Sequence, residues 1–67
     1  MTYEEVINHF GSAYRVAKML GISKQSVGKW LERGFVPLLR QHQLEKLSNG
    51  KLKIDDIDVY ESRIGEK

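Results

Sequence analysis

The sequence feature that most limits which fold this chain can adopt is a regular alternation of helix-capping residues with glycines. Serine and threonine cap helix N-termini with their hydroxyl oxygens, and glycine ends helices because it readily adopts left-handed backbone angles. Three such pairs follow one another: Thr2 with Gly11, Ser12 with Gly21, and Ser23 with Gly34. Between the members of each pair, apolar residues recur at helical spacing. The pattern predicts three short helices: residues 3–10, about nine residues after Ser12, and the segment between Ser23 and Gly34.

A fourth helix is predicted between Pro37 and the pair Asn49-Gly50. Proline suits the first turn of a helix, and Asn-Gly is a strong terminator. The 67 residues leave room for a single domain, which we assign to residues 1–64, with residues 65–67 as a flexible tail. The chain has no cysteine, so disulfide bonds and thiolate zinc sites are excluded and packing must hold the core.

The segment after Gly50 allows two interpretations. Leu52 and Ile54 alternate with lysines, as in a short β element within residues 51–62. Alternatively, Asp55 or Asp56 could cap a short helix, in which apolar residues recur at helical spacing. We favour the helix. The expected fold is therefore a mostly α, single-domain bundle of four to five short helices.

Charge is unevenly distributed along the chain. Residues 1–53 carry nine basic and four acidic side chains, a net charge of +5, whereas residues 54–67 carry a net charge of −3. The excess is concentrated between residues 12 and 40, where six basic side chains accompany a single acid, Glu32. This middle part of the chain could bind a polyanion.

Residues 13–32 have the spacing of a helix-turn-helix, in which two short helices cross through a tight turn. Ala17 is small enough to let the helices approach each other, and Gly21 suits the positive φ that such a turn commonly requires. Val27 follows six residues after Gly21. Trp30 could stack on bases, as could Phe35, but its helical spacing with Val27 favours a place in the core.

The start of the second helix of this motif would expose polar or small residues and no acid, which suits the major groove of DNA. Lysine can donate to guanine there and glutamine can pair with adenine, so Lys24 and Gln25 are the first candidates. The predicted base-contacting residues are Ser23, Lys24, Gln25, Ser26, Gly28 and Lys29. The predicted phosphate-contacting residues, which position a protein without reading sequence, are Ser12, Arg15, Lys18, Arg33 and Arg40.

Other classes of function fit the sequence less well. His9 and His42 lie far apart and offer neither a catalytic pair nor a metal site. The acidic run at residues 55–58 lacks the glycine and distal glutamate of a calcium loop. We therefore expect no enzyme, metal or cofactor. No apolar run approaches the roughly 18 residues of a membrane span. A small module that binds another protein remains the competing class.

Several segments, spread over about residues 1–50, together resemble a known family. They are Val6-Ile7-x-His9-Phe10-Gly11, Val16-Ala17-Lys18-x-Leu20-Gly21-Ile22-Ser23, Val27-x-x-Trp30, Val36-Pro37 and Leu39-Arg40-Gln41. The chain is similar here to the Cro repressors of lambdoid phages, and most to their all-helical branch. The resemblance implies a small repressor that binds palindromic operator DNA as a dimer, with the third helix (about 23–33) in the major groove. Its motif places base contacts on Ser23, Lys24, Gln25, Gly28 and Lys29, although Gly28 departs from the longer polar residue of some members.

The resemblance also implies a cytoplasmic location in a bacterial host, in association with double-stranded operator DNA. We expect a weak homodimer, which could form only on the DNA, and no small-molecule effector. The candidate dimer residues are Phe35, Leu38, Leu52, Ile54, Ile57, Val59 and Tyr60. The alternative is a chromosomal or antitoxin-like helix-turn-helix regulator that acts mainly through a protein partner.

Overall fold

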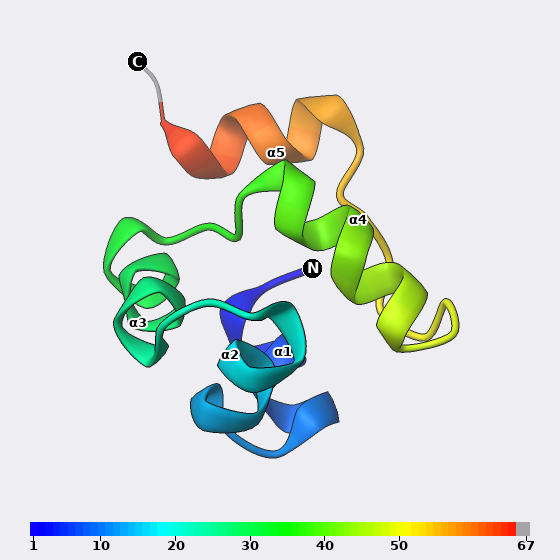
Figure 1. The fold of residues 1–67 in the computed structure, drawn as a ribbon. Coiled ribbons are helices and arrows are strands. Elements are labelled where there is room, and N and C mark those ends of the chain that lie inside the picture. Colours follow the sequence, from blue (N-terminus) through cyan, green and yellow to red (C-terminus); the bar gives the residue numbers. More distant parts are fainter. Residues whose placement is uncertain (66–67) are drawn as a thin grey trace.

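The computed structural model describes residues 1–65, which form five helices and no strand (Figure 1). In chain order the helices are α1 (Tyr3–Phe10), α2 (Ala13–Leu20), α3 (Lys24–Arg33), α4 (Leu38–Leu47) and α5 (Ile57–Ile64). The expected mostly α fold is thus confirmed. No helix within residues 1–65 is both long enough and apolar enough to cross a membrane. Of the expected flexible tail, residues 66–67 lie outside the described part of the chain.

The helix starts follow from the caps that the sequence predicts. The Thr2 hydroxyl accepts the backbone N–H of Glu5 at 3.1 Å, and the Glu5 carboxylate accepts the N–H of Thr2 at 2.7 Å, which completes a capping box. The hydroxyls of Ser12 and Ser23 cap α2 and α3 by accepting the N–H of Arg15 and of Ser26, without the reciprocal bond of a capping box. Pro37 occupies the N-cap position of α4, one residue earlier than the predicted first turn.

The β alternative for residues 51–62 is wrong. Asp56 caps α5, and its side chain accepts the N–H of Val59 at 3.0 Å. The preceding extended residues do not pair with another strand, because their backbone groups bond elsewhere in the molecule. The carbonyl of Lys53 accepts the N-terminal ammonium of Met1, and the N–H of Asp55 donates to the side chain of Gln41.

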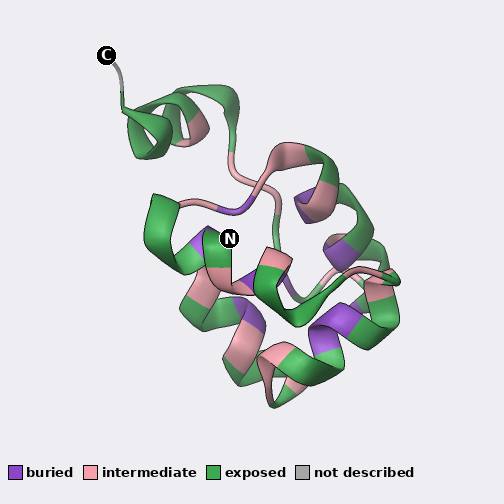
Figure 2. Cartoon of the chain, turned by 60° about the vertical axis from the view of Figure 1, so that its left-hand side comes forward, coloured by how far each residue is buried: buried purple, intermediate pink, exposed green. Residues whose placement is uncertain are grey.

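The core draws one or two residues from nearly every part of the chain (Figure 2). Its buried apolar members are Met1, Val6, Val16, Ala17, Val27, Trp30, Val36, Leu44 and Leu52. Trp30 therefore packs in the core, as its spacing predicts, and Leu52 is no longer a candidate for the dimer surface. Leu31, the residue after Trp30 on α3, is by contrast 60% exposed.

Helix α5 contributes no buried residue to this core and lies at one side of the bundle (Figure 1). Three side-chain contacts attach α5 to the rest of the molecule. The Tyr60 hydroxyl accepts the N–H of Leu38 at 3.2 Å, which satisfies one of the free donors at the start of α4. The Tyr60 ring also meets the Phe35 ring edge to face, with centroids 5.9 Å apart. The Arg63 guanidinium forms an ion pair with Asp55 at 3.1 Å.

Candidate nucleic-acid interface

The turn between α2 and α3 has the geometry that its glycine predicts. Gly21 adopts a left-handed conformation, with φ of 71° and ψ of 32°. Its N–H donates to the carbonyls of Ala17 and Lys18, and the N–H of Ile22 donates to the carbonyl of Ala17 at 3.0 Å. Ala17 is only 4% exposed, in keeping with its position between packed helices. These bonds close the end of α2 and direct the chain into α3 (Figure 1).

Two serines organise the start of α3. The Ser23 hydroxyl oxygen accepts the N–H of Ser26 at 3.1 Å and lies 2.9 Å from the Ser26 hydroxyl oxygen. One hydroxyl of this pair donates to the other, so a single hydroxyl proton is left for an outside acceptor. The serines are thus candidates to contact DNA that also hold the first turn of the helix.

Helix α3 buries one face and exposes the other. Val27 and Trp30 are buried, whereas Lys24, Gln25 and Lys29 are exposed. The remaining predicted base-contacting residues are Ser23, which is exposed, and Ser26 and Gly28, which are half-buried. The first turn of α3 contains no acidic residue. The structure therefore presents an acid-free polar surface at the start of the helix.

Gly28 has no structural reason to be glycine within the molecule. Its φ lies outside the left-handed region, and apart from its chain neighbours and the nearby backbone of α3, no atom lies within 4 Å of the position that a Cβ would occupy. Alanine is the better helix former at such a site. A glycine at this half-buried place on α3 is consistent with close approach of a ligand to the helix backbone.

The predicted phosphate-contacting residues come from α2, α3, α4 and the residue that caps α2. Arg15, Lys18 and Arg33 are exposed, while Ser12 and Arg40 are half-buried. Lys18 lies 5.5 Å from the centre of the Tyr14 ring, and Arg40 donates to the side chain of Gln43 at 2.9 Å. Among residues 1–65, both ion pairs involve Asp55, so these cations are not neutralised by a described carboxylate.

The helix-turn-helix, with the acid-free surface at the start of α3, defines a DNA-binding protein. A family model described as "DNA-binding transcriptional regulator Cro" matches residues 2–64. The "Regulatory protein cro" of Salmonella phage P22 is 39% identical over 56 residues, which cover 84% of this chain and 88% of that protein. The chain belongs to the Cro family of DNA-binding transcriptional regulators, which are not enzymes. No solved structure matches the chain.

Proposed function

We propose that this protein, acting through residues 1–64, represses transcription as a dimer on two-fold symmetric operator DNA, with α3 in the major groove. The observation that carries the proposal is the exposed, acid-free start of α3, held by a serine cap and a glycine turn. An α-helix fits the major groove, and a dimer would place two such helices about 34 Å apart, one turn of DNA. A dimer bound there would exclude RNA polymerase from an overlapping promoter.

Dimer formation would use apolar side chains that the monomer leaves accessible. Ile57 and Val59 on α5 are 57% and 40% exposed. Phe35, Leu38, Ile54 and Tyr60 are half-buried. These residues remain the candidates for the contact between two copies. Selection of bound sequences from a random DNA pool tests the symmetry, because a dimer enriches a palindrome, whereas a monomer enriches a single half-site.

Salt dependence separates this function from a regulator that acts mainly through a protein partner. Each phosphate contacted by a lysine or arginine releases a counterion, so the log of the affinity falls with the log of the salt concentration, with a slope of about −0.9 per contact. Several contacts from the predicted cations would give a steep slope. Absence of DNA affinity at low salt would favour the protein-partner function.

Gln25→Ala is expected to relax specificity at one base position of each half-site. Its exposed amide can pair with the edge of adenine, and one such pair discriminates by about 1–3 kcal/mol. Affinity for operator DNA should therefore fall while affinity for random DNA changes little, as measured by fluorescence anisotropy at fixed salt. Asn8→Ala, which removes an exposed amide on α1, is the control and should change neither. Equal losses on both DNAs would contradict base reading by Gln25.

Gly28→Ala is expected to raise the stability of the protein while lowering its affinity for operator DNA. Because the Cβ meets open space, the free energy of unfolding should rise by about 0.5–1 kcal/mol, the usual gain from alanine in a helix. The operator affinity should fall, because the added methyl group holds the helix backbone away from the DNA. Urea unfolding and a binding titration of the same sample measure both effects. Unchanged affinity in the stabilised variant would show that DNA does not approach this backbone.

A further inference from the structure

Helix α5 carries an exposed strip in which apolar and acidic side chains lie together. Residues three or four positions apart share one side of a helix, so Ile57, Glu61 and Ile64 lie in a row. Asp58 borders this row, three positions before Glu61. All four side chains are exposed, and the two isoleucines are 57% and 46% exposed. We call these four residues the α5 strip.

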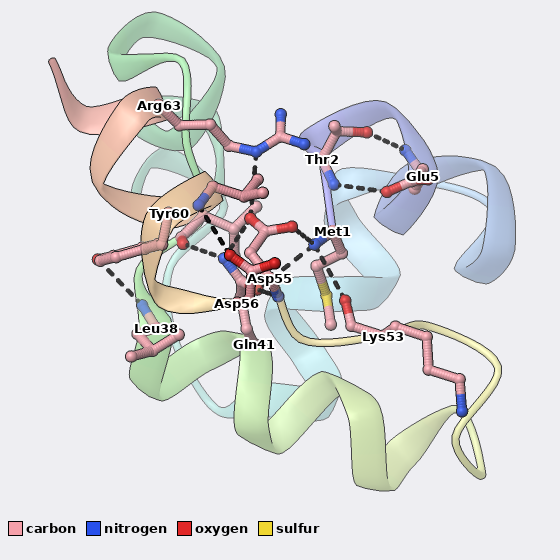
Figure 3. A network of polar contacts seen from close by, with 12 residues as sticks. Met1, Thr2, Glu5, Leu38, Gln41, Lys53, Asp55, Asp56, Tyr60 and Arg63 are labelled. Carbon is pink, nitrogen blue, oxygen red and sulfur yellow. Dashed lines mark hydrogen bonds and ion pairs between the residues drawn. The ribbon is translucent and has the colours of Figure 1, made fainter.

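The α5 strip lies on a side of the helix that faces away from the bundle, because other residues attach α5 to the molecule. Tyr60 points toward the start of α4, where its hydroxyl accepts the N–H of Leu38 (Figure 3). Arg63 points toward Asp55, with which it forms an ion pair. No residue of α5 is buried. These attachments fix the helix, so the strip cannot turn toward the core of its own chain.

A groove of about 270 Å³ between α2 and α4 is complementary to this strip. It is lined by Met19, Leu20, Gln43, Lys46 and Leu47. Met19 and Leu47 are 43% and 45% exposed despite their apolar side chains. Among the described residues that line the groove, Lys46 is the only charged one, and it is exposed. The groove therefore offers apolar surface beside a cation, whereas the α5 strip offers apolar surface beside two acids.

We propose that the α5 strip of one copy docks into the groove between α2 and α4 of a second copy of this chain. Ile57 and Ile64 pack against the apolar lining of the groove. Glu61 then faces Lys46 of the other copy. In a two-fold pair each copy gives its strip and accepts the strip of the other, so the contact forms twice.

Charge favours a second copy as the occupant of the groove. An apolar surface without a partner marks an interaction site, and complementary charge selects which partner binds. The strip and the groove carry opposite charges on the same chain, so any two copies present a matched pair. None of the residues that line the groove is among the predicted DNA contacts.

This inference rests on the dimer of the proposed function and specifies its contact surface. Of the two exposed candidates on α5, it retains Ile57 but not Val59. Val59 lies two positions further along the helix, which is about 200° around its axis, and therefore outside the strip.

Charge reversal tests the contact by sedimentation equilibrium in the absence of DNA. Lys46→Glu and Glu61→Lys each bring like charges together in both contacts of the pair, so each should raise the dimer Kd at least about tenfold. An equimolar mixture of these two variants should pair with a Kd within about threefold of that of the parent, because both contacts then join opposite charges. Such rescue requires that the two residues belong to different chains.

Lys51→Glu is the matched control, because Lys51 is exposed but does not line the groove, and it should change the Kd less than about threefold. Circular dichroism checks that each variant is folded.

Ile57→Ala and Val59→Ala test the apolar part of the contact. Ile57→Ala removes buried apolar area from both contacts and should raise the dimer Kd at least about tenfold, whereas Val59→Ala should change it less than about threefold. Equal effects of these two variants would overturn the inference, as would a parent-like Kd for either charge reversal or no rescue in the mixture.

The same measurements distinguish failure of this contact from failure of the proposed function. A parent chain that stays monomeric at millimolar concentration without DNA would overturn the inference, even where it enriches a palindrome and so supports the proposed function. Conversely, failure to enrich a palindrome would count against the proposed function, whereas rescue in the mixture would still support the contact between copies.

Discussion

Gln41→Ala is expected to lower the free energy of unfolding by about 3 kcal/mol or more, because it leaves buried polar groups unpaired and opens a cavity. Gln41 is 0% exposed. Its amide nitrogen donates to the carbonyl of Val36 at 2.9 Å and to Asp55 at 3.2 Å, and its oxygen accepts the N–H of Asp55 at 2.9 Å. That oxygen also receives the ammonium of Met1. Each buried group left without a partner costs about 1–3 kcal/mol.

Thermal and urea unfolding measure this loss. For a domain of this size each 1 kcal/mol shifts Tm by about 4–8 °C, so Tm should fall by about 15 °C. Gln43→Ala is the matched control, because Gln43 is exposed on the same helix, and it should change stability by less than about 0.5 kcal/mol. Gln41→Leu keeps the volume but not the hydrogen bonds and should also destabilise. A loss below about 1 kcal/mol in both Gln41 variants would contradict the role assigned to this amide.

The helix boundaries were predictable because they depend on neighbours in sequence. The capping box joins Thr2 to Glu5, and Gly21 ends α2 through bonds to residues three and four positions earlier. Such contacts need no tertiary information. The exposed surface of α3 follows from the same local features, since the cap at Ser23 and the buried pair Val27 and Trp30 together set which side of the helix faces outward.

The polar network could not be predicted in this way. Met1 and Asp55 are separated by 54 positions, and the sequence indicates Asp55 only as a possible helix cap. Apolar residues are usually buried and glutamine is usually exposed, but α4 shows the reverse at two positions. Leu39 is 67% exposed and Gln41 is buried. The available signal is spacing: Gln41, Leu44 and Ser48 follow at i, i+3 and i+7, and all three are buried.

The proposed dimer surface could not be predicted from the sequence either, for a related reason. It would consist of apolar residues that remain accessible after the monomer has packed, so it would depend on every tertiary contact. Leu52 enters the core, whereas Ile57 and Val59 stay exposed. Hydrophobic character alone does not distinguish these three residues.

Asp55 should make the stability of the protein depend on pH. Burial raises the pKa of its carboxyl, but the hydrogen bond and charge of the Met1 ammonium, a hydrogen bond from Gln41 and the charge of Arg63 together bring the pKa below the ordinary value of 3.8. The folded state therefore favours ionised Asp55 more than the unfolded state does. This contribution is present above the unfolded pKa and is lost as pH falls through the lower, folded pKa.

Asp55→Asn should remove that dependence. At pH 7 we expect the variant to be less stable than the parent by about 3 kcal/mol, because the Met1 ammonium loses the carboxylate that faces it. The difference should begin to shrink as pH falls below about 5 and continue to shrink to below the folded pKa, since a protonated carboxyl resembles an amide. Urea unfolding from pH 7 to pH 2 measures the two curves. Asp58→Asn, at an exposed position in the first turn of α5, should give a curve parallel to that of the parent. If the Asp55→Asn curve also remains parallel to that of the parent, the ion pair with the N-terminus contributes nothing to acid sensitivity.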